Sequence, residues 1–567
     1  RCLVHRGPDE EGRFLSPDGR CAVGFQRLGV IDPAGSHQPM STPDGMVAVA
    51  YNGEIYNYKD LRDDLAAGGA VFRTAGDTEV LLHLYLRDGP RMVRELVGMF
   101  AFVIYDARDG TLLLARDRLG EKPLWYAGTE ERLVFASEAK ALKVHPAIHF
   151  HIDKTSLIYY STMGYIPSGP SAWQGVRKLP PGHTMTASGS VDPPVRYWSP
   201  EPKPCLLEGK DLRQSVRERV RRSVRQRLVS DVPLGALLSG GLDSSIIVAL
   251  MAEAAGEAGG VKTFTAGFED QTYDERPAAA AVAQHCRSDH TELLVRPDPK
   301  ALLDAVVERF DEPFGDSSAI PTLLVCRAAR EHVTVALAGD GGDEVFGGYD
   351  RYRAMHLAER MGPFAYTAVR GAAALAGLFA PLDERSRLRR LVRFADGLTQ
   401  PPPLQYLTYR AIFPPSDLPR LFSREFLEEV DAGQVERWFC DLYEDADFKD
   451  EVSYAQRHDL LTYLPDDLLV KTDTASMATS LELRSPMLDP DLVEFGLGLR
   501  AEAKVGRRRG KAVLREAFAD MLPDSVLHGR KRGFGVPLGR WLREDMRATA
   551  EEVLLDGPLL DTGWFRR

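Results

Sequence analysis

A short segment rich in glycine and serine, SGGLDSS (Ser239–Ser245), lies between an apolar run and a helical pattern. Gly240 and Gly241 would let backbone N–H groups approach an anion, and the serine hydroxyls and the positive end of the following helix add donors. No lysine follows in the GxxxxGK[ST] spacing of a P-loop, and Asp243 instead supplies a carboxylate suited to Mg²⁺. The segment therefore predicts a pyrophosphate-binding loop. A glycine-rich turn with a serine cap is the alternative.

A second glycine-rich loop, AGDGGDEVFGGY (Ala338–Tyr349), follows the strand-like run Val333–Leu337. Ligands of open parallel sheets bind at the carboxyl edge, where both loops would lie. Asp243 and Asp343 would then bridge Mg²⁺ onto the phosphates of ATP. A solvent-exposed acidic turn is the alternative interpretation.

The elements that must position these loops begin with a β-rich region from His5 to about Trp198. Short apolar runs at Met46–Tyr56, Gly98–Asp106 and Thr111–Asp117 are separated by turn residues, which predicts layered antiparallel sheet. One amphipathic helix is expected at Asp77–Arg87.

The proline-rich stretch Pro194–Cys205 predicts a linker. Beyond it, strand-like and helical patterns alternate, which is typical of a doubly wound parallel sheet. From about Tyr352 the pattern is mostly helical. The expected elements after the linker are a helix at 212–229, a strand at 232–240, a helix at 243–255 and a strand over VKTFTAGF.

Composition narrows the class of protein. The 567 residues include 71 Lys and Arg against 82 Asp and Glu, a net charge of −11, with 44% hydrophobic residues. This acidic balance, with no basic run longer than Arg507–Arg509, argues against nucleic-acid binding. The longest apolar run, Gly371–Leu382, is shorter than the roughly 18 residues of a membrane helix. Six dispersed cysteines without a CxxC pair argue against a zinc site and favour a reducing cytoplasm.

At this point the chain resembles the glutamine-hydrolysing asparagine synthetases over nearly its whole length. In the first half the matching motifs are HRGPDEEG, QRLGVID, YNGEIYN and GDTEV. In the second half, besides the two loops, they are Asp311–Thr322, Leu464–Asp489, Gly510–Phe518 and Arg530–Arg543.

The resemblance implies two domains. Residues 1–190 would form a glutaminase domain, an N-terminal-nucleophile αββα sandwich, and residues 191–207 a linker. Residues 208–567 would form an ATP-pyrophosphatase synthetase domain with a doubly wound parallel sheet and a helical C-terminal part. The implied reaction activates a carboxylate as an acyl-adenylate, which ammonia from glutamine converts to an amide with release of AMP. ATP and Mg²⁺ would be required, L-aspartate is the default acceptor, the location would be cytoplasmic, and a homodimer is compatible with the family.

The resemblance also assigns the glutamine site. Arg27 would hold the glutamine carboxylate, Asn52 and Gly53 would form the oxyanion hole, and Glu54 and Asp77 would bind the amino end. These residue types suit the chemistry of glutamine hydrolysis. The oxyanion that forms when the amide is attacked needs two hydrogen-bond donors, and the zwitterionic end of glutamine needs one cation and one carboxylate to orient it. The full predicted set is Arg27, Leu28, Val30, Ile31, Asn52, Gly53, Glu54 and Asp77.

The ATP site is assigned in the same way. Asp243 and Asp343 would hold the metal, and Asp340 and Lys511 would join Asn52 and Gly53 as catalytic residues, with a solvated helix lysine as the alternative for Lys511. The predicted ATP-binding residues are Leu238, Ser239, Gly240, Gly241, Asp243, Ser244, Ala266, Ala338 and Gly339. Many members of the family have glutamate and serine where this chain has Asp340 and Ala338. These differences leave the identity of the acceptor acid open, but we still expect an enzyme that forms an acyl-adenylate.

The family nucleophile is a cysteine at the mature amino terminus, and this chain begins Arg1-Cys2. We expect Cys2 to be a helix or core thiol, the first strand to be missing, and the carboxyl end at GWFRR to be clipped. Two rival functions remain. One is a relative of the β-lactam synthetases that acts on another acid, with a decayed first domain. The other is a non-catalytic regulator that binds ATP.

Overall fold

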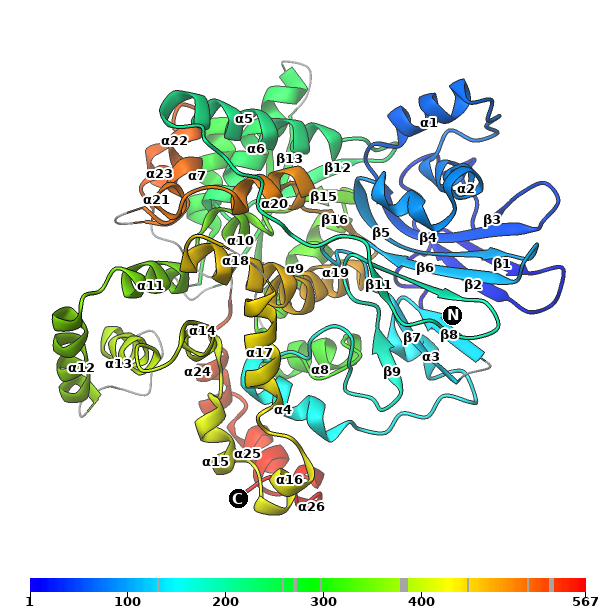
Figure 1. Cartoon of the computed structure of the whole chain (residues 1–567). Coiled ribbons are helices and arrows are strands. Elements are labelled where there is room, and N and C mark those ends of the chain that lie inside the picture. Colours follow the sequence, from blue (N-terminus) through cyan, green and yellow to red (C-terminus); the bar gives the residue numbers. More distant parts are fainter. Residues whose placement is uncertain are drawn as a thin grey trace.

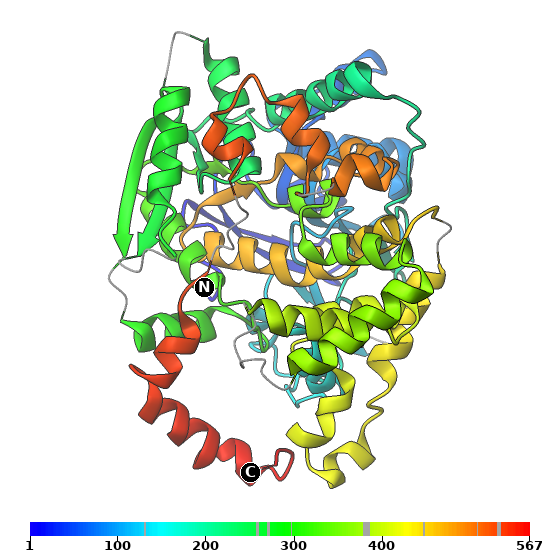
Figure 2. The same ribbon diagram turned by 90° about the vertical axis from the view of Figure 1, so that its left-hand side faces the viewer.

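The computed structural model shows two domains packed against each other, with a helical region and a carboxyl-terminal arm extending from the second (Figures 1 and 2). The structure describes residues 1–566 except 130–131, 257–259, 269–272, 296–297, 378–385, 446–447, 507–508 and 530–534. The arginine run Arg507–Arg509, the apolar run Gly371–Leu382 and the motif Arg530–Arg543 therefore lie partly outside the described residues.

The first domain is built on antiparallel sheet, as predicted. Its largest sheet has six strands in the order β11-β10-β6-β5-β4-β3, beside a three-stranded sheet, β8-β7-β9, and the hairpin β1-β2. Its elements are β1 (Glu10–Leu15), β2 (Ala22–Arg27), β3 (Met40–Ser41), β4 (Val47–Ile55), α1 (Tyr58–Ala67), α2 (Asp77–Asp88), η1 (Gly89–Arg94), β5 (Gly98–Asp106), β6 (Thr111–Arg116), β7 (Trp125–Thr129), β8 (Arg132–Ala136), α3 (Ala139–Leu142), α4 (Lys154–Met163), β9 (Val176–Lys178), β10 (His183–Ala187) and β11 (Val195–Arg196).

Alternating side chains place a core on each face of the six-stranded sheet. In β5, Phe102 and Ile104 contribute to the core that contains α1 and α2, whereas Ala101 and Val103 contribute to the core that includes residues of β1, β2 and β7. Helix α3 packs on the outer face of β7. The layers thus run helix, sheet, sheet, helix.

The second domain contains the predicted parallel sheet, in the order β14-β13-β12-β15-β16. The chain starts in the middle strand β12, extends to one edge and then returns to the other, so that the strand order reverses between β12 and β15. The elements are α5 (Gly209–Gln226), β12 (Leu234–Leu237), α6 (Leu242–Ala255), β13 (Lys262–Phe268), α7 (Arg276–Cys286), β14 (Asp289–Val295), α8 (Pro299–Arg309), α9 (Ala319–Arg330), β15 (Val335–Leu337), α10 (Gly342–Phe346) and β16 (Glu482–Arg484).

The region after residue 349 is mostly helical, which confirms the prediction, although β16 interrupts it. The helices are α11 (Asp350–Glu359), α12 (Pro363–Gly377), α13 (Arg387–Gly397), α14 (Pro402–Arg410), α15 (Leu418–Leu421), α16 (Arg424–Glu429), α17 (Gln434–Glu444), α18 (Glu451–Leu461), a π-helical turn η4 (Leu464–Leu468), α19 (Leu469–Met477), α20 (Pro490–Leu497), α21 (Ala501–Val505), α22 (Ala512–Ala517), α23 (Asp524–Leu527), α24 (Leu538–Arg543), α25 (Arg547–Leu555) and α26 (Pro558–Asp561), with short 3₁₀ turns at Pro415–Asp417 and Pro486–Leu488.

Two further expectations can be checked against the described residues. Cys2 is exposed and lies in a series of turns, so the prediction of a helix or core thiol is wrong. In the part of the chain that the structure describes, no helix is both long enough and apolar enough to cross a membrane.

Candidate active sites

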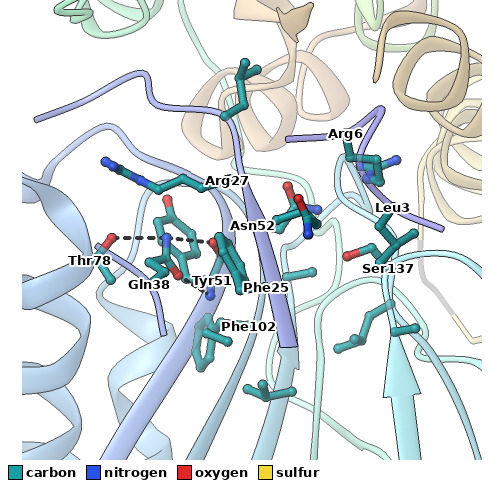
Figure 3. Close-up of a pocket in the computed structure, with 18 of the residues that line it drawn as sticks. Leu3, Arg6, Phe25, Arg27, Gln38, Tyr51, Asn52, Thr78, Phe102 and Ser137 are labelled. Atoms are coloured by element: carbon teal, nitrogen blue, oxygen red, sulfur yellow. Dashed lines mark hydrogen bonds between the residues drawn. The ribbon is translucent and has the colours of Figure 1, made fainter. Parts of the chain in front are cut away.

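A cavity of about 240 Å³ lies at the end of the first domain that faces the second (Figure 3). All eight residues of the predicted glutamine site line it, from the loop after β2, from β4 and from the start of α2. The structure therefore brings together residues that are up to 50 positions apart in the sequence. Their individual roles toward glutamine remain predictions.

Asn52 and Gly53, which are predicted to form the oxyanion hole, are neighbours on β4. Gly53 has a φ of +139°, and a Cβ atom at this position would lie 2.0 Å from the carbonyl oxygen of Met99 on the paired strand β5. Only glycine fits there. The side-chain Nδ2 of Asn52 is buried and has no hydrogen-bond partner among the described residues. A buried donor without an acceptor is costly, so this N–H group is available to a ligand oxygen.

Arg27, at the end of β2, is buried, and its guanidinium group is hydrogen-bonded to neighbouring protein groups. Its guanidinium donates to the carbonyl oxygens of Pro33 (2.7 Å) and Asp32 (3.0 Å), and it is 3.3 Å from Glu10 Oε2. These contacts fix the planar group at the cavity wall, and its part in binding the glutamine carboxylate stays a prediction.

The two predicted acids differ in their surroundings. Asp77 accepts hydrogen bonds from Tyr51 Oη (2.9 Å) and the Ile55 amide (3.1 Å), and burial raises its pKa to about 6. Glu54 lies 3.5 Å from Arg484 of the second domain, and burial, together with the charge of Glu482, raises its pKa well above the ordinary value.

The sequence reasoning missed several residues of this cavity. Gln38 is hydrogen-bonded to the backbone of strand β4. Its Nε2 donates to the Tyr51 carbonyl (3.0 Å), and its Oε1 accepts from the Tyr51 amide (2.7 Å). Met477 and Glu482 line the same cavity from the second domain. No local pattern marks these residues, because their place depends on how the domains pack.

The second candidate site lies between the loops that follow β12 and β15. Gly240 has a φ of +71°, and a Cβ there would lie 2.6 Å from Ala278 on the neighbouring helix α7. Ser239 Oγ lies 3.0 Å from Ser244 Oγ across the loop, and α6 begins directly afterwards with Asp243 in its first turn. The loop that is predicted to bind phosphate therefore forms a tight turn at a helix start.

The two predicted metal carboxylates meet at a single ammonium group. Lys511 Nζ forms an ion pair with Asp243 and lies 2.7 Å from Asp343 Oδ1. Lys511 is buried and has a φ of +58°, a strained value for a residue that is not glycine. Burial opposes its charge, but the two carboxylates outweigh this effect and raise the pKa of Lys511. The alternative of a solvated helix lysine is wrong.

The loops touch so closely that side chains would separate them. A Cβ at Gly342 would lie 2.5 Å from Asp243 Cγ, and one at Gly339 would lie 3.1 Å from the Ser244 amide nitrogen. The Ala338 amide donates to the Arg484 carbonyl (2.9 Å), so β16 fixes the start of the second loop. Leu238 directly follows β12, and Ala266 lies within the neighbouring strand β13. Both are buried, and their contact with a nucleotide stays a prediction.

Asp340 belongs to the same loop but faces another group. Burial raises its pKa, while Lys471 on α19 acts in the opposite direction. Lys471 is itself buried and lies 3.5 Å from Asp316. The catalytic role of Asp340 stays a prediction.

Two family models cover this chain. The glutamine amidotransferase domain matches residues 1–198 and the asparagine synthase model matches residues 215–567. The chain belongs to the asparagine synthase family. This finding confirms the family that the sequence resembles and with it the enzyme class, a glutamine-hydrolysing ligase.

Relatives align over nearly the whole chain. Asparagine synthetase (glutamine-hydrolysing) 1 of Bacillus subtilis strain 168 is 35% identical over 558 residues, which cover 97% of this chain and 85% of the relative. Asparagine synthetase (glutamine-hydrolysing) 3 of the same organism is 30% identical, over 93% and 82% of the two chains. A protein of Gibberella zeae named amidase chry2 is 27% identical, over 95% and 84%.

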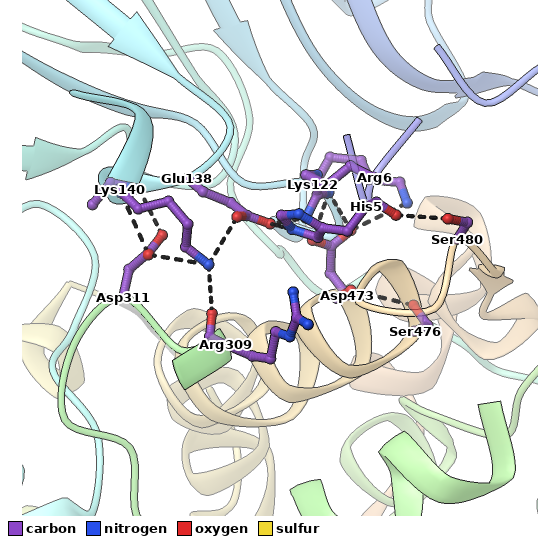
Figure 4. Close-up of polar contacts among 11 residues, drawn as sticks. His5, Arg6, Lys122, Glu138, Lys140, Arg309, Asp311, Asp473, Ser476 and Ser480 are labelled. Atoms are coloured by element: carbon purple, nitrogen blue, oxygen red, sulfur yellow. Dashed lines mark hydrogen bonds and ion pairs between the residues drawn. The ribbon is translucent and has the colours of Figure 1, made fainter. Parts of the chain in front are cut away.

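The amidotransferase and synthetase domains are joined by a buried charge cluster near the glutamine cavity (Figure 4). Arg6 donates to Glu138 Oε1 (3.0 Å) and forms an ion pair with Asp473 on α19 (2.8 Å). Lys122 reaches the same aspartate at 3.3 Å, and Ser480 Oγ donates to the His5 carbonyl (2.7 Å). The two cations of the first domain are thus neutralised in part by a carboxylate of the second. We refer to Arg6, Lys122, Glu138 and Asp473 as the interdomain clasp.

Proposed function

We propose that this protein converts L-aspartate to L-asparagine at the expense of ATP, with ammonia from glutamine, and releases AMP and pyrophosphate. The family membership supports the reaction class. The identity of the acid, the use of Mg²⁺, the role of each site residue and the domain boundaries at 190 and 207 belong to the proposal, as do a cytoplasmic location and a homodimer.

The observation that supports it best is the meeting of Asp243, Asp343 and Lys511. These residues come from three segments spread over 268 positions of the chain, yet the two carboxylates contact one ammonium. Elements converge in this way when a charged ligand must be held, because a buried ion pair adds little net stability by itself. A scaffold that binds no charged ligand would have no need for this cluster.

The residues suit attack of a carboxylate on the α-phosphorus of ATP. Backbone N–H groups of the Gly240 turn and the start of α6 would bind the departing pyrophosphate. Lys511 would stabilise negative charge that develops on the phosphorus. Asp243 and Asp343 would hold Mg²⁺, which supplies charge neutralisation on the phosphate oxygens.

In the amidotransferase domain, Arg27 and Asp77 would bind the carboxylate and ammonium groups of glutamine. Asn52 Nδ2 and the Gly53 amide would then donate to the oxyanion formed when a thiolate attacks the side-chain amide. The cavity and the unpartnered Asn52 donor favour a working amidotransferase site over a decayed one.

The test is pyrophosphate release from ATP and Mg²⁺ with ammonia as nitrogen donor, over a panel of carboxylic acids. We expect release with L-aspartate and formation of asparagine and AMP in equal amounts. Release only with another acid, with closure of an internal amide, would support the β-lactam-synthetase-like alternative. If no acid leads to pyrophosphate release, the proposed adenylating activity is contradicted.

A further inference from the structure

Helix α12 is part of neither site, although the longest apolar run of the sequence begins inside it. It lies at the outer edge of the helical region, on the side away from the amidotransferase domain (Figure 1). Among its described residues Ala373 alone is buried. A Cβ at Gly377 would lie 3.9 Å from Val392 Cγ2, so α12 packs on α13 through the side that carries Ala373 and Gly377.

The opposite side of α12 is an apolar stripe that faces solvent. Its residues, spaced at i, i+4, i+7 and i+11, are Phe364, Ala368, Gly371 and Leu375. At about 100° per residue, all four lie within about 40° of the direction opposite Ala373. All four are exposed, and the exposed fraction is 89% for Phe364 and 68% for Leu375. Apolar side chains that gather on one exposed face mark an interaction surface. We refer to these four residues as the α12 stripe.

Positive charge surrounds the α12 stripe. The helices α12 and α13 contain a single acid, Asp396, against five arginines, which are Arg370, Arg387, Arg389, Arg390 and Arg393. Arg393 donates to the Ala411 carbonyl (2.6 Å), and Arg390 lies 3.5 Å from the exposed Asp350. The other three arginines are exposed. This local excess of positive charge stands in a chain whose net charge is −11.

The arginines of α13 are near enough to act on whatever covers the stripe. Packed helices such as α12 and α13 have axes about 8–10 Å apart. Charges in water interact over about 10 Å at 0.1 M salt. A partner that meets the stripe should therefore be both apolar and negatively charged.

A second copy of the chain fits this description poorly. A symmetric contact through α12 would bring the arginines of one copy toward those of the other. The helix has 15 residues, so the stripe is about 22 Å long and about 10 Å wide. Such a strip covers far less than the ~800 Å² that each partner of a standard protein interface buries.

An anionic bilayer fits it better. A helix that exposes apolar side chains next to basic ones can lie in the plane of the lipid headgroups, with its apolar side in the boundary to the acyl chains. The 15 residues of α12 are fewer than the ~20 that a spanning helix needs, so the contact would be with the surface.

We propose that α12 and α13 attach the protein to a membrane surface that contains anionic phospholipids. Phe364 and Leu375 would enter the boundary between headgroups and acyl chains, and the arginines would be attracted to the lipid phosphates. The inference concerns where the enzyme works and does not depend on which acid it amidates.

The test is co-sedimentation of the full chain with lipid vesicles. Vesicles of phosphatidylcholine with about one third phosphatidylglycerol should bind the protein, and vesicles of phosphatidylcholine alone should not. Raising the salt from about 0.05 M to about 0.5 M should weaken binding at least tenfold, because it screens the arginines.

Two double variants separate the apolar and the basic contributions. Phe364→Ser with Leu375→Ser should weaken binding at least tenfold, since both side chains leave water on binding. Arg387→Gln with Arg389→Gln should weaken it about fivefold for each arginine. All four positions are exposed, so circular dichroism should show an unchanged fold.

Matched controls change the same residue types elsewhere. Leu206→Ser replaces a leucine that is 90% exposed, and Arg420→Gln with Arg424→Gln replaces two exposed arginines outside α12 and α13. These variants should bind like the wild type. Equal binding to both kinds of vesicle, or equal losses in test and control variants, would overturn the proposal. Absence of vesicle binding, together with a molar mass in light scattering that falls only in the stripe variant, would show an interface between copies instead.

Discussion

Replacing Lys511 by methionine removes the ammonium that Asp243 and Asp343 share. Two carboxylates would then face each other in a site where Lys511 is only 6% exposed. Breaking a buried ion pair in this way costs about 3–5 kcal/mol, because the remaining charges are left uncompensated. Removal of a preorganised donor from a transition state typically lowers kcat by about 10²–10³.

We therefore expect Lys511→Met to lower pyrophosphate release by about 10²–10³ and to lower the melting temperature by several degrees. Mg²⁺ should restore part of this stability, because a cation between the carboxylates replaces the missing charge. The assays are pyrophosphate release with aspartate and ammonia, and thermal unfolding with and without Mg²⁺.

Lys504→Met is the matched control. Lys504 is also buried, but its Nζ contacts Ser453 Oγ (3.0 Å) and the Leu497 carbonyl, and burial lowers its pKa to about 8. Methionine should be tolerated there and should leave activity and the effect of Mg²⁺ near wild type. Wild-type activity in Lys511→Met, or an equal loss in both variants, would refute the charge argument.

Four further substitutions test other parts of the molecule, and one of them is tested through its pH dependence. Arg27→Ala should weaken glutamine binding by at least tenfold in calorimetry while ammonia-dependent synthesis stays normal; equal losses in both would contradict its assignment. Asp77 has a pKa raised to about 6, so the folded protein holds this proton more tightly than the unfolded chain, and the stability contribution of Asp77 falls as pH rises from about 4 to 6. Glutamine binding needs the ionised form and should weaken below about pH 6, a dependence that Asp77→Asn should reduce but not remove, because the pKa of Glu54, the other predicted acid, is also raised. Gly240→Val should eliminate ATP binding in a fluorescence titration, because the side chain would collide with α7 and distort the cradle; retained binding would remove the assignment of this loop. Arg6→Ala should cost on the order of 3 kcal/mol and separate the unfolding of the two domains in calorimetry, whereas a single unshifted transition would show that the clasp is dispensable.

The sequence predicts much of this site because parallel strands bring their carboxyl ends to one edge. The loops at Ser239 and Ala338 follow recognisable strands, so their meeting follows from topology. Lys511 was predicted only through family resemblance, since a lysine next to a helix has no distinctive pattern. Its burial and its contact with both aspartates come from the path of the chain after α21.

Other features could not be anticipated from local patterns. Strand β16 is three residues long and lies between helices, yet it completes the sheet and holds Ala338 through the Arg484 carbonyl. Packing of this kind is decided by the whole core rather than by periodicity.

The interdomain clasp bears on how such enzymes can change over evolution. Asp473 forms ion pairs with two cations of the amidotransferase domain, Arg6 and Lys122. All four residues of the clasp are buried at the interface between the domains. A domain exchanged with that of a relative that lacks one of these charges would leave its partner unmatched in a buried site. The two halves of the gene are therefore constrained to vary together at these positions, and recombination between relatives should succeed only where both sides of the clasp are inherited from one parent.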